Sequence, residues 1–296
     1  MSEPTNHDPV ATETREELQR ALHEIEAWEA SQKDLWFWEK LGRLPFMLLD
    51  RLTPRFVQEK IGQALDEVGS YVQTGGQYLL SEKSVLHRLE EQLNGAGPYA
   101  GTRLLALEEV PTLPLSVMDR TADALAQHRS NLAAAQGATT GIGGLFTLAV
   151  DIPAVLGLSL KVIQEMALIY GYDPNQKRER IFTVKCLQFA SSDIVGKKAI
   201  LVELADFDNE LRHKEVVSQL QGWREVVNAY RDNFGWKKLF QLVPIAGMVF
   251  GAVINRSTLQ DVAEASKMLY RKRRVKERLC SAPSGESAPQ EHSKEK

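Results

Sequence analysis

Apolar residues recur at intervals of three and four along most of the chain, which is the period of an amphipathic α-helix. Residues 14–31 give the first example, because Leu18, Leu22, Ile25 and Trp28 fall on one helical face. Alternating runs of Val, Ile and Thr, which would indicate half-buried strands, are scarce. The pattern therefore predicts an all-α protein.

The same period, punctuated by capping and turn residues, predicts the other helices. Their approximate ranges are 54–75, 78–93, 114–136, an apolar helix that ends at Gly171, 177–190, 194–204, 208–230, 236–254 and 257–278. Pro54 after Thr53 suits a helix start, and Ser257 with Gln260 has the spacing of a capping box. The expected inward residues are Met118, Ala122, Leu125 and Leu132 in one helix, and Leu259, Val262, Ala263, Ser266, Leu269 and Tyr270 in another.

The chain shows neither an internal repeat nor an internal linker, so we expect one helical domain over residues 13–280. Residues 1–12 and 281–296 offer little apolar surface to bury and are expected to be disordered tails. The fold class predicted is a single multi-helix bundle with glycine-rich apolar helical hairpins.

Two apolar segments carry glycines at helical spacing, where small residues let neighbouring helix backbones approach closely. The glycines concerned are Gly137, Gly141 and Gly144 in the first segment, and Gly247 and Gly251 in the second. In the first segment, Asp151 stands two residues before Pro153 and is expected to be a buried polar cap of a new helix. These segments suit a buried hairpin of a soluble bundle, or a hairpin that enters or lies on a membrane. A nucleotide-binding loop is disfavoured because G-x-x-x-x-G-K-[ST] is absent.

Charge is distributed unevenly along the chain. The formal net charge is −3, yet residues 237–278 hold ten Lys and Arg against three acids. This basic region predicts contact with anionic lipid through Lys237, Lys238, Arg271, Lys272, Arg273 and Arg274. The alternative is a solvated helix end whose cations favour the C-terminal dipole. Nucleic acid is not an expected partner, since no recognised binding fold accompanies the charge.

Three consecutive aromatic residues, Trp36, Phe37 and Trp38, cannot all face one core from a helix, so at least one is expected at an interface. Packing between helices and contact with lipid headgroups both remain open for them. The polar, acidic start of the chain lacks the order of a signal peptide, which predicts a cytoplasmic protein. The two cysteines fit no paired-thiol motif, and we expect no metal site and no cofactor.

Residues 138–174 resemble the signature of the EcsC protein family. The glycine turn, Asp-Ile-Pro at 151–153, the run that contains Gln164 and Glu165, and Tyr-Gly-Tyr-Asp-Pro at 170–174 all carry the likeness. Residues 237–255 are similar to a second block of that family. The resemblance implies a helical, intracellular protein. It also implies a link to an ATP-driven transporter connected with secretion, because the family takes its name from an operon that encodes one.

The function expected from the sequence is therefore that of a non-catalytic accessory protein, peripheral on the inner face of the cytoplasmic membrane, with a transporter as a possible partner. The alternative is a soluble helical module that binds a ligand or a protein without membrane contact. An uncharacterised hydrolase is the third reading, disfavoured because G-x-S-x-G and H-E-x-x-H are absent and no two histidines stand four residues apart. The sequence leaves the oligomeric state open.

Overall fold

The computed structural model describes residues 13–32, 80–95, 101, 103–104, 106–141, 145–192, 194–205, 207 and 244–282. Of residues 141, 145–153, 194–195 and 244–251 it describes the backbone only. The described parts form eight helices and contain no strand, which confirms the all-α prediction. They are α1 (Arg15–Ser31), α5 (Glu82–Asn94), η1 (Leu107–Thr112), α6 (Leu115–Gly141), α7 (Leu145–Ile169), α8 (Lys177–Ser191), α9 (Ile194–Ala205) and α12 (Pro244–Ser281).

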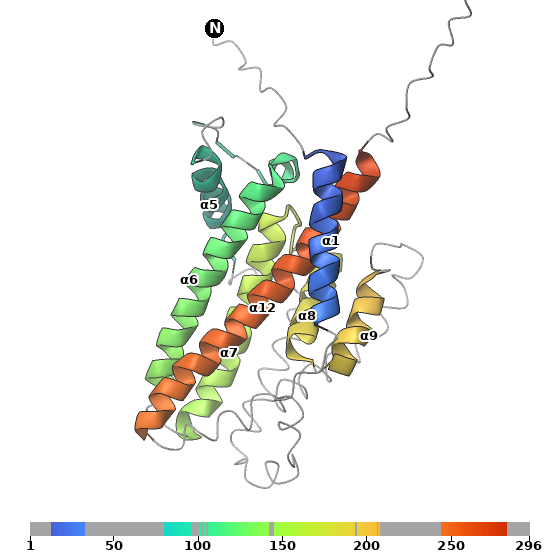
Figure 1. The fold of residues 1–296 in the computed structure, drawn as a ribbon. Helices are drawn as coiled ribbons and strands as arrows, with labels where there is room; N and C mark the ends of the chain where they lie inside the picture. The colour runs from blue at the N-terminus through green and yellow to red at the C-terminus, as the bar shows by residue number, and fades with distance from the viewer. Residues whose placement is uncertain are drawn as a thin grey trace, which may run out of the picture.

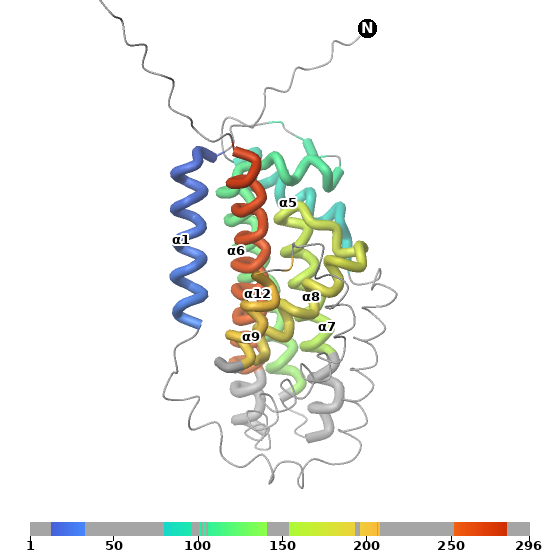
Figure 2. The backbone as a smooth tube through the Cα atoms, turned by 90° about the vertical axis from the view of Figure 1, so that its right-hand side faces the viewer, coloured from blue at the N-terminus to red at the C-terminus, as the bar shows by residue number. Residues whose placement is uncertain are grey.

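Helices α6, α7 and α12 are the centre of the bundle, and each contacts the other two (Figure 1). Helix α12 crosses the bundle diagonally and packs along α6, while α1 and α8 also pack on it. The side view shows α1 as an outer layer beside α12 (Figure 2). Apolar side chains from α6, α7, α8 and α12 meet in the core, where Met118, Ile163, Phe189 and Tyr270 are fully buried.

Local sequence signals account well for α1 and for the start of α5. Thr14 caps α1 and forms a capping box with Glu17, which stands three residues after it. Leu18 and Ile25 of α1 are buried, as expected. Helix α5 begins at Glu82 rather than near residue 78, because the side chain of Ser81 accepts the hydrogen bond of an otherwise unpaired backbone N–H.

Three of the expected helix boundaries are wrong, two of them around the first glycine-rich segment. Helix α6 does not stop at the glycines but continues to Gly141. The new helix expected at Asp151 is absent, because α7 already begins at Leu145 and runs through Asp151 and Pro153. Asp151 is therefore not the N-terminal cap of a helix, and its side chain lies outside the described residues.

The break expected between residues 254 and 257 is also absent, since α12 is continuous from Pro244 to Ser281. Ser257 lies in its interior and does not cap a helix. Next to it, the hydroxyl of Thr258 donates to the carbonyl oxygen of Ile254 at 2.8 Å, which satisfies a polar group inside the helix. Over the described residues 244–278, the two last expected helices are thus one helix and not a hairpin. Residues 142–144, which would turn the first hairpin, lie outside the described residues.

The inward face of α12 is confirmed, because Leu259, Val262, Ala263, Ser266, Leu269 and Tyr270 are all buried. In α6 the prediction fails at one position. Leu132 is 45% exposed, while Ala133 is fully buried in its place. A helix turns by 3.6 residues, so the face that contains Met118, Ala122 and Leu125 continues through residues 129 and 133.

Helix α7 ends as its glycine predicts. Gly171 has φ +78°, its N–H bonds to the carbonyl of Leu168 at 3.0 Å, and the N–H of Tyr172 bonds to that of Ala167 at 2.9 Å. This pair of bonds is a Schellman motif, which requires the left-handed backbone that glycine adopts without strain. The turn directs the chain from α7 towards α8.

We predict that Gly171→Ala lowers the free energy of unfolding by about 1–3 kcal/mol in urea denaturation, because a side chain in left-handed backbone is strained. The added Cβ would also approach Pro111 Cγ to 2.9 Å and Arg274 Nη2 to 3.0 Å. The matched control is Gly157→Ala inside α7, where a Cβ meets no heavy atom within 4 Å. That substitution should stabilise the protein by about 0.5–1 kcal/mol. Equal effects of the two substitutions would contradict the assignment.

Candidate functional site

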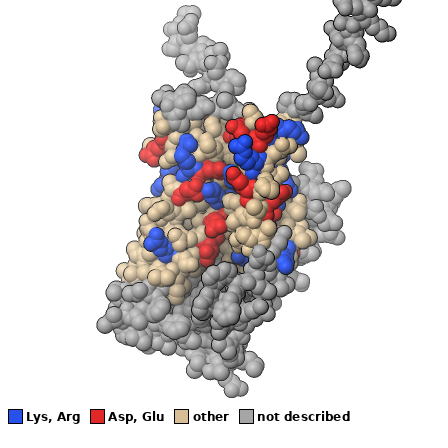
Figure 3. Space-filling model, viewed as in Figure 1, with Lys and Arg blue, Asp and Glu red and all other residues tan. Residues whose placement is uncertain are grey.

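The C-terminal third of α12 carries six cations between Arg271 and Arg278. The residues are Arg271, Lys272, Arg273, Arg274, Lys276 and Arg278. Over the face shown in Figure 3, cations and acids gather together on the upper parts of α1, α6 and α12.

Three cations tie α12 to the N-terminal part of the chain. Arg271 bonds to Glu24 of α1 at 3.1 Å and to Asp119 of α6 at 3.0 Å, and Lys272 bonds to Glu29 of α1 at 2.6 Å. Arg278 pairs with Glu13 and also donates to the carbonyl oxygens of residues 111 and 113, at 2.9 and 2.6 Å. These contacts join segments more than a hundred residues apart in sequence.

Arg273 is the most enclosed of these cations. It makes two hydrogen bonds to Glu179 of α8, at 2.7 and 2.9 Å, and both side chains are less than 10% exposed. The guanidinium also lies over the rings of Tyr172 and Phe182, at 4.1 and 4.4 Å from their centroids. Burial alone would lower the pKa of Arg273, but the hydrogen bonds and charge of Glu179 raise it above its ordinary value. The group is therefore a permanent internal cation.

Arg274 holds the end of α7. Its Nη2 and Nε donate to the carbonyl oxygen of Tyr170 at 2.6 and 2.9 Å, and its Nη1 donates to Glu277 at 2.8 Å. Carbonyls at a helix C-terminus lack partners within their own helix and carry partial negative charge. Arg274 supplies both a donor and a positive charge there.

Two buried groups near this cluster, the thiol of Cys186 and the hydroxyl of Tyr170, hold their protons more tightly than usual. Burial raises the pKa of Cys186 well above its ordinary value, so the thiol stays protonated at neutral pH. Burial and the neighbouring Asp119, which accepts its hydrogen bond at 2.7 Å, likewise raise the pKa of Tyr170. Among the residues that the structure describes, no group of His, Cys, Asp and Glu is arranged to hold a metal ion.

These contacts correct one prediction about the basic region. Arg273 and Arg274 are only 6% and 7% exposed, so neither faces lipid. Arg271 and Lys272 are both largely buried and bonded to carboxylates. The carboxylate partners of Arg271, Lys272 and Arg273 are distant in sequence, as is the carbonyl of Tyr170 that Arg274 binds, so the local charge count could not reveal them. Trp36, Phe37, Trp38, Lys237 and Lys238 lie outside the described residues.

The opposite end of the bundle has almost no charged residues. Residues 130–141 of α6 and 244–255 of α12 include no charged residue, and residues 145–160 of α7 include only Asp151. These three stretches end together at the lower left of Figure 1. We call them the charge-free end. None of the helices in the described parts of the chain is long and apolar enough to span a bilayer.

Two large apolar side chains are exposed on the charge-free end. Leu132 of α6 is 45% exposed and Val253 of α12 is 59% exposed. The sequence placed Leu132 inside and did not single out Val253. Of the five glycines expected at close helix packing, Gly137 is buried in α6. Close packing at Gly141, Gly144, Gly247 and Gly251 stays a prediction.

Comparison with known proteins gives one family. The model of the EcsC protein family matches residues 19–275. The uncharacterized protein YdbA of Bacillus subtilis (strain 168) is 59% identical over 270 residues, which cover 91% of this chain and 97% of YdbA. Protein EcsC of the same strain is 27% identical over 239 residues, covering 79% of this chain and 92% of that protein. No solved structure matches the chain.

For the buried pair, we predict that Arg273→Met lowers the free energy of unfolding by about 3–5 kcal/mol, because Glu179 is left as an uncompensated buried charge. The double variant Arg273→Met with Glu179→Leu should recover most of that loss. Urea denaturation followed by circular dichroism measures both. A double variant as unstable as the single one would show that the ring contacts, rather than the ion pair, are the important interaction.

Proposed function

Because the chain belongs to the EcsC protein family, we propose that it is a non-catalytic accessory protein, peripheral on the inner face of the cytoplasmic membrane. In this proposal the charge-free end enters the headgroup and outer acyl region of one leaflet. The ion-paired end remains in water. The partner that it assists is a membrane protein of transport or secretion, as the family resemblance implies.

One observation carries the proposal: three neighbouring helices become charge-free at the same end of the bundle, apart from Asp151. Soluble proteins expose single apolar residues freely, but a whole helical end without charge is typical of an interaction surface. The exposed Leu132 and Val253 lie within this end and would be removed from water on insertion.

The length of these stretches supports partial insertion. Twelve to sixteen helical residues at 1.5 Å each extend for about 18–24 Å, which is less than the roughly 30 Å of a bilayer core. Insertion of a helical end into one leaflet needs no spanning segment and stays reversible. Asp151 opposes deep insertion, because a carboxylate within hydrocarbon is costly.

The competing function is a helical module that binds a protein or ligand without membrane contact. It is favoured by the internal pairing of Arg271, Lys272, Arg273 and Arg274, which leaves those cations little capacity for lipid. The two functions differ in what the charge-free end contacts, and vesicle binding separates them.

We expect the full chain to float with vesicles that contain phosphatidylglycerol, strongly at low salt and partly at high salt, because apolar burial is not screened. Val253→Asp should weaken vesicle binding by about tenfold or more, since it replaces an apolar contact with a charge. Val202→Asp is the matched control, because Val202 is 69% exposed on α9, away from the charge-free end. A wild-type protein that stays in the soluble fraction at both salt concentrations would refute the proposal.

Asp151→Asn provides a test in the opposite direction. The substitution removes the one charge from the charge-free stretches, so vesicle binding should become about tenfold tighter in the same flotation assay. Thermal unfolding followed by circular dichroism checks that the variant is folded. Unchanged or weaker binding by a folded variant would place Asp151 outside the inserted region.

A further inference from the structure

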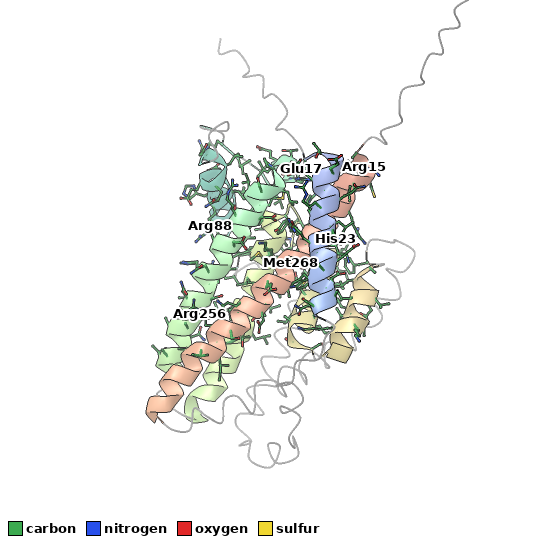
Figure 4. The ribbon with its side chains drawn as sticks, viewed as in Figure 1. Arg15, Glu17, His23, Arg88, Arg256 and Met268 are labelled. Atoms are coloured by element: carbon green, nitrogen blue, oxygen red, sulfur yellow. The ribbon has the colours of Figure 1, made fainter. Side chains whose placement is uncertain are left out.

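The border of the charge-free end is made of cations. On leaving this end, the first charged residue is Arg129 on α6, Lys161 on α7 and Arg256 on α12. Figure 4 places Arg256 well below Met268 along α12, towards the charge-free end. Asp151 lies inside the α7 stretch, but the first charge beyond each stretch is a cation, although acids outnumber cations in the whole chain, 39 against 36.

Two ion pairs between α12 and α6 show which residue of α6 lies opposite Arg256. Lys267 pairs with Asp123, and Arg271 with Asp119, so α12 runs antiparallel to α6 in a fixed register. Continued down both helices, that register brings Arg256 opposite about residue 134 of α6.

Lys161, the border residue of α7, lies opposite nearly the same position of α6 as Arg256 does. Arg129 of α6 bonds to Glu165 of α7 at 2.8 Å. Lys161 lies one turn below Glu165, opposite about residue 133 of α6. Lys161 and Arg256 therefore lie at a similar height above the charge-free end.

Pairing distinguishes these cations from one another. Arg129 is neutralised by Glu165, and both side chains are largely buried. Arg256 is exposed, Lys161 is partly buried, and neither makes an ion pair with any residue that the structure describes. The two thus differ from Arg271, Lys272, Arg273 and Arg274, which are bonded to carboxylates.

We infer that Lys161 and Arg256 form a collar that binds the phosphates of anionic lipid headgroups when the charge-free end is inserted. This inference rests on the proposed function and adds the lipid class to it. Lys and Arg side chains at an apolar–polar boundary keep their stems along apolar surface and their charged ends at headgroup depth. A guanidinium suits a phosphate by two parallel hydrogen bonds, and an ammonium suits it as a compact charge.

The test compares Lys161→Gln, Arg256→Gln and the double variant for binding to two kinds of vesicle, neutral phosphatidylcholine and phosphatidylcholine with about a third phosphatidylglycerol. Each single variant should bind the anionic vesicles about fivefold less tightly, and the double variant about twenty-five-fold. Binding to neutral vesicles should change little. The dependence of binding on salt should become shallower in the double variant.

Lys276→Gln is the matched control. Lys276 is an exposed cation of the same helix, at the ion-paired end, and its loss changes the net charge equally. It should bind both kinds of vesicle as the wild type does. Equal weakening by Lys276→Gln would overturn the collar, because net charge alone would then explain the effect.

The outcomes also separate this inference from the proposed function. A wild-type chain that binds no vesicle refutes the proposed function and the collar together. A wild-type chain that binds both vesicle types equally, or collar variants that bind anionic vesicles as tightly as the wild type, refutes the collar alone. Circular dichroism and thermal unfolding confirm that the variants are folded, and Gln at both positions keeps a polar, helix-compatible side chain.

Discussion

The cations of α12 between Arg271 and Arg278 must be neutralised inside the bundle, and the arrangement of the surrounding helices depends on this requirement. A buried guanidinium without a partner costs several kcal/mol, so the fold brings Glu179 of α8 to Arg273 and the carbonyl of Tyr170 to Arg274. Acids of α1 and α6 serve Arg271 and Lys272 in the same way. The cations of residues 271–278, a pattern typical of a protein surface, thus lie where α1, α6, α7 and α8 contact α12.

This arrangement gives the bundle two unlike ends. At one end, charges are numerous but largely paired, so the count of +7 over residues 237–278 overstates the charge that is available to an anionic surface. At the other end, α6, α7 and α12 lack charge apart from Asp151, and exposed apolar side chains such as Val253 face outward. The proposed membrane contact therefore depends on the end with few charges and on the collar above it, and not on the most basic stretch of the chain.

Features that depend on neighbouring residues could be predicted from the sequence, whereas features that depend on distant partners could not. The capping box of Thr14 and Glu17 and the glycine turn at residue 171 are complete within a few residues, and the sequence predicts a helix that starts near residue 14 and one that ends at Gly171. Ser257 carries the same kind of capping signal, yet α12 runs through it without a break and packs along α6. The cluster of cations predicts lipid contact for Arg273, but its partner Glu179 lies 94 residues away and does not enter that local count. The cation border at Lys161 and Arg256 is visible in the sequence as the sign of the first charge beyond each apolar stretch.

Hydrogen–deuterium exchange of the full chain, with and without vesicles that contain phosphatidylglycerol, tests most directly whether the charge-free end meets the membrane. Added vesicles should slow exchange of backbone amides in residues 130–141, 145–160 and 244–255, and leave residues 271–278 unchanged. Protection confined to residues 271–278, or no protection anywhere, would contradict the claim that the charge-free end is the surface that meets the membrane.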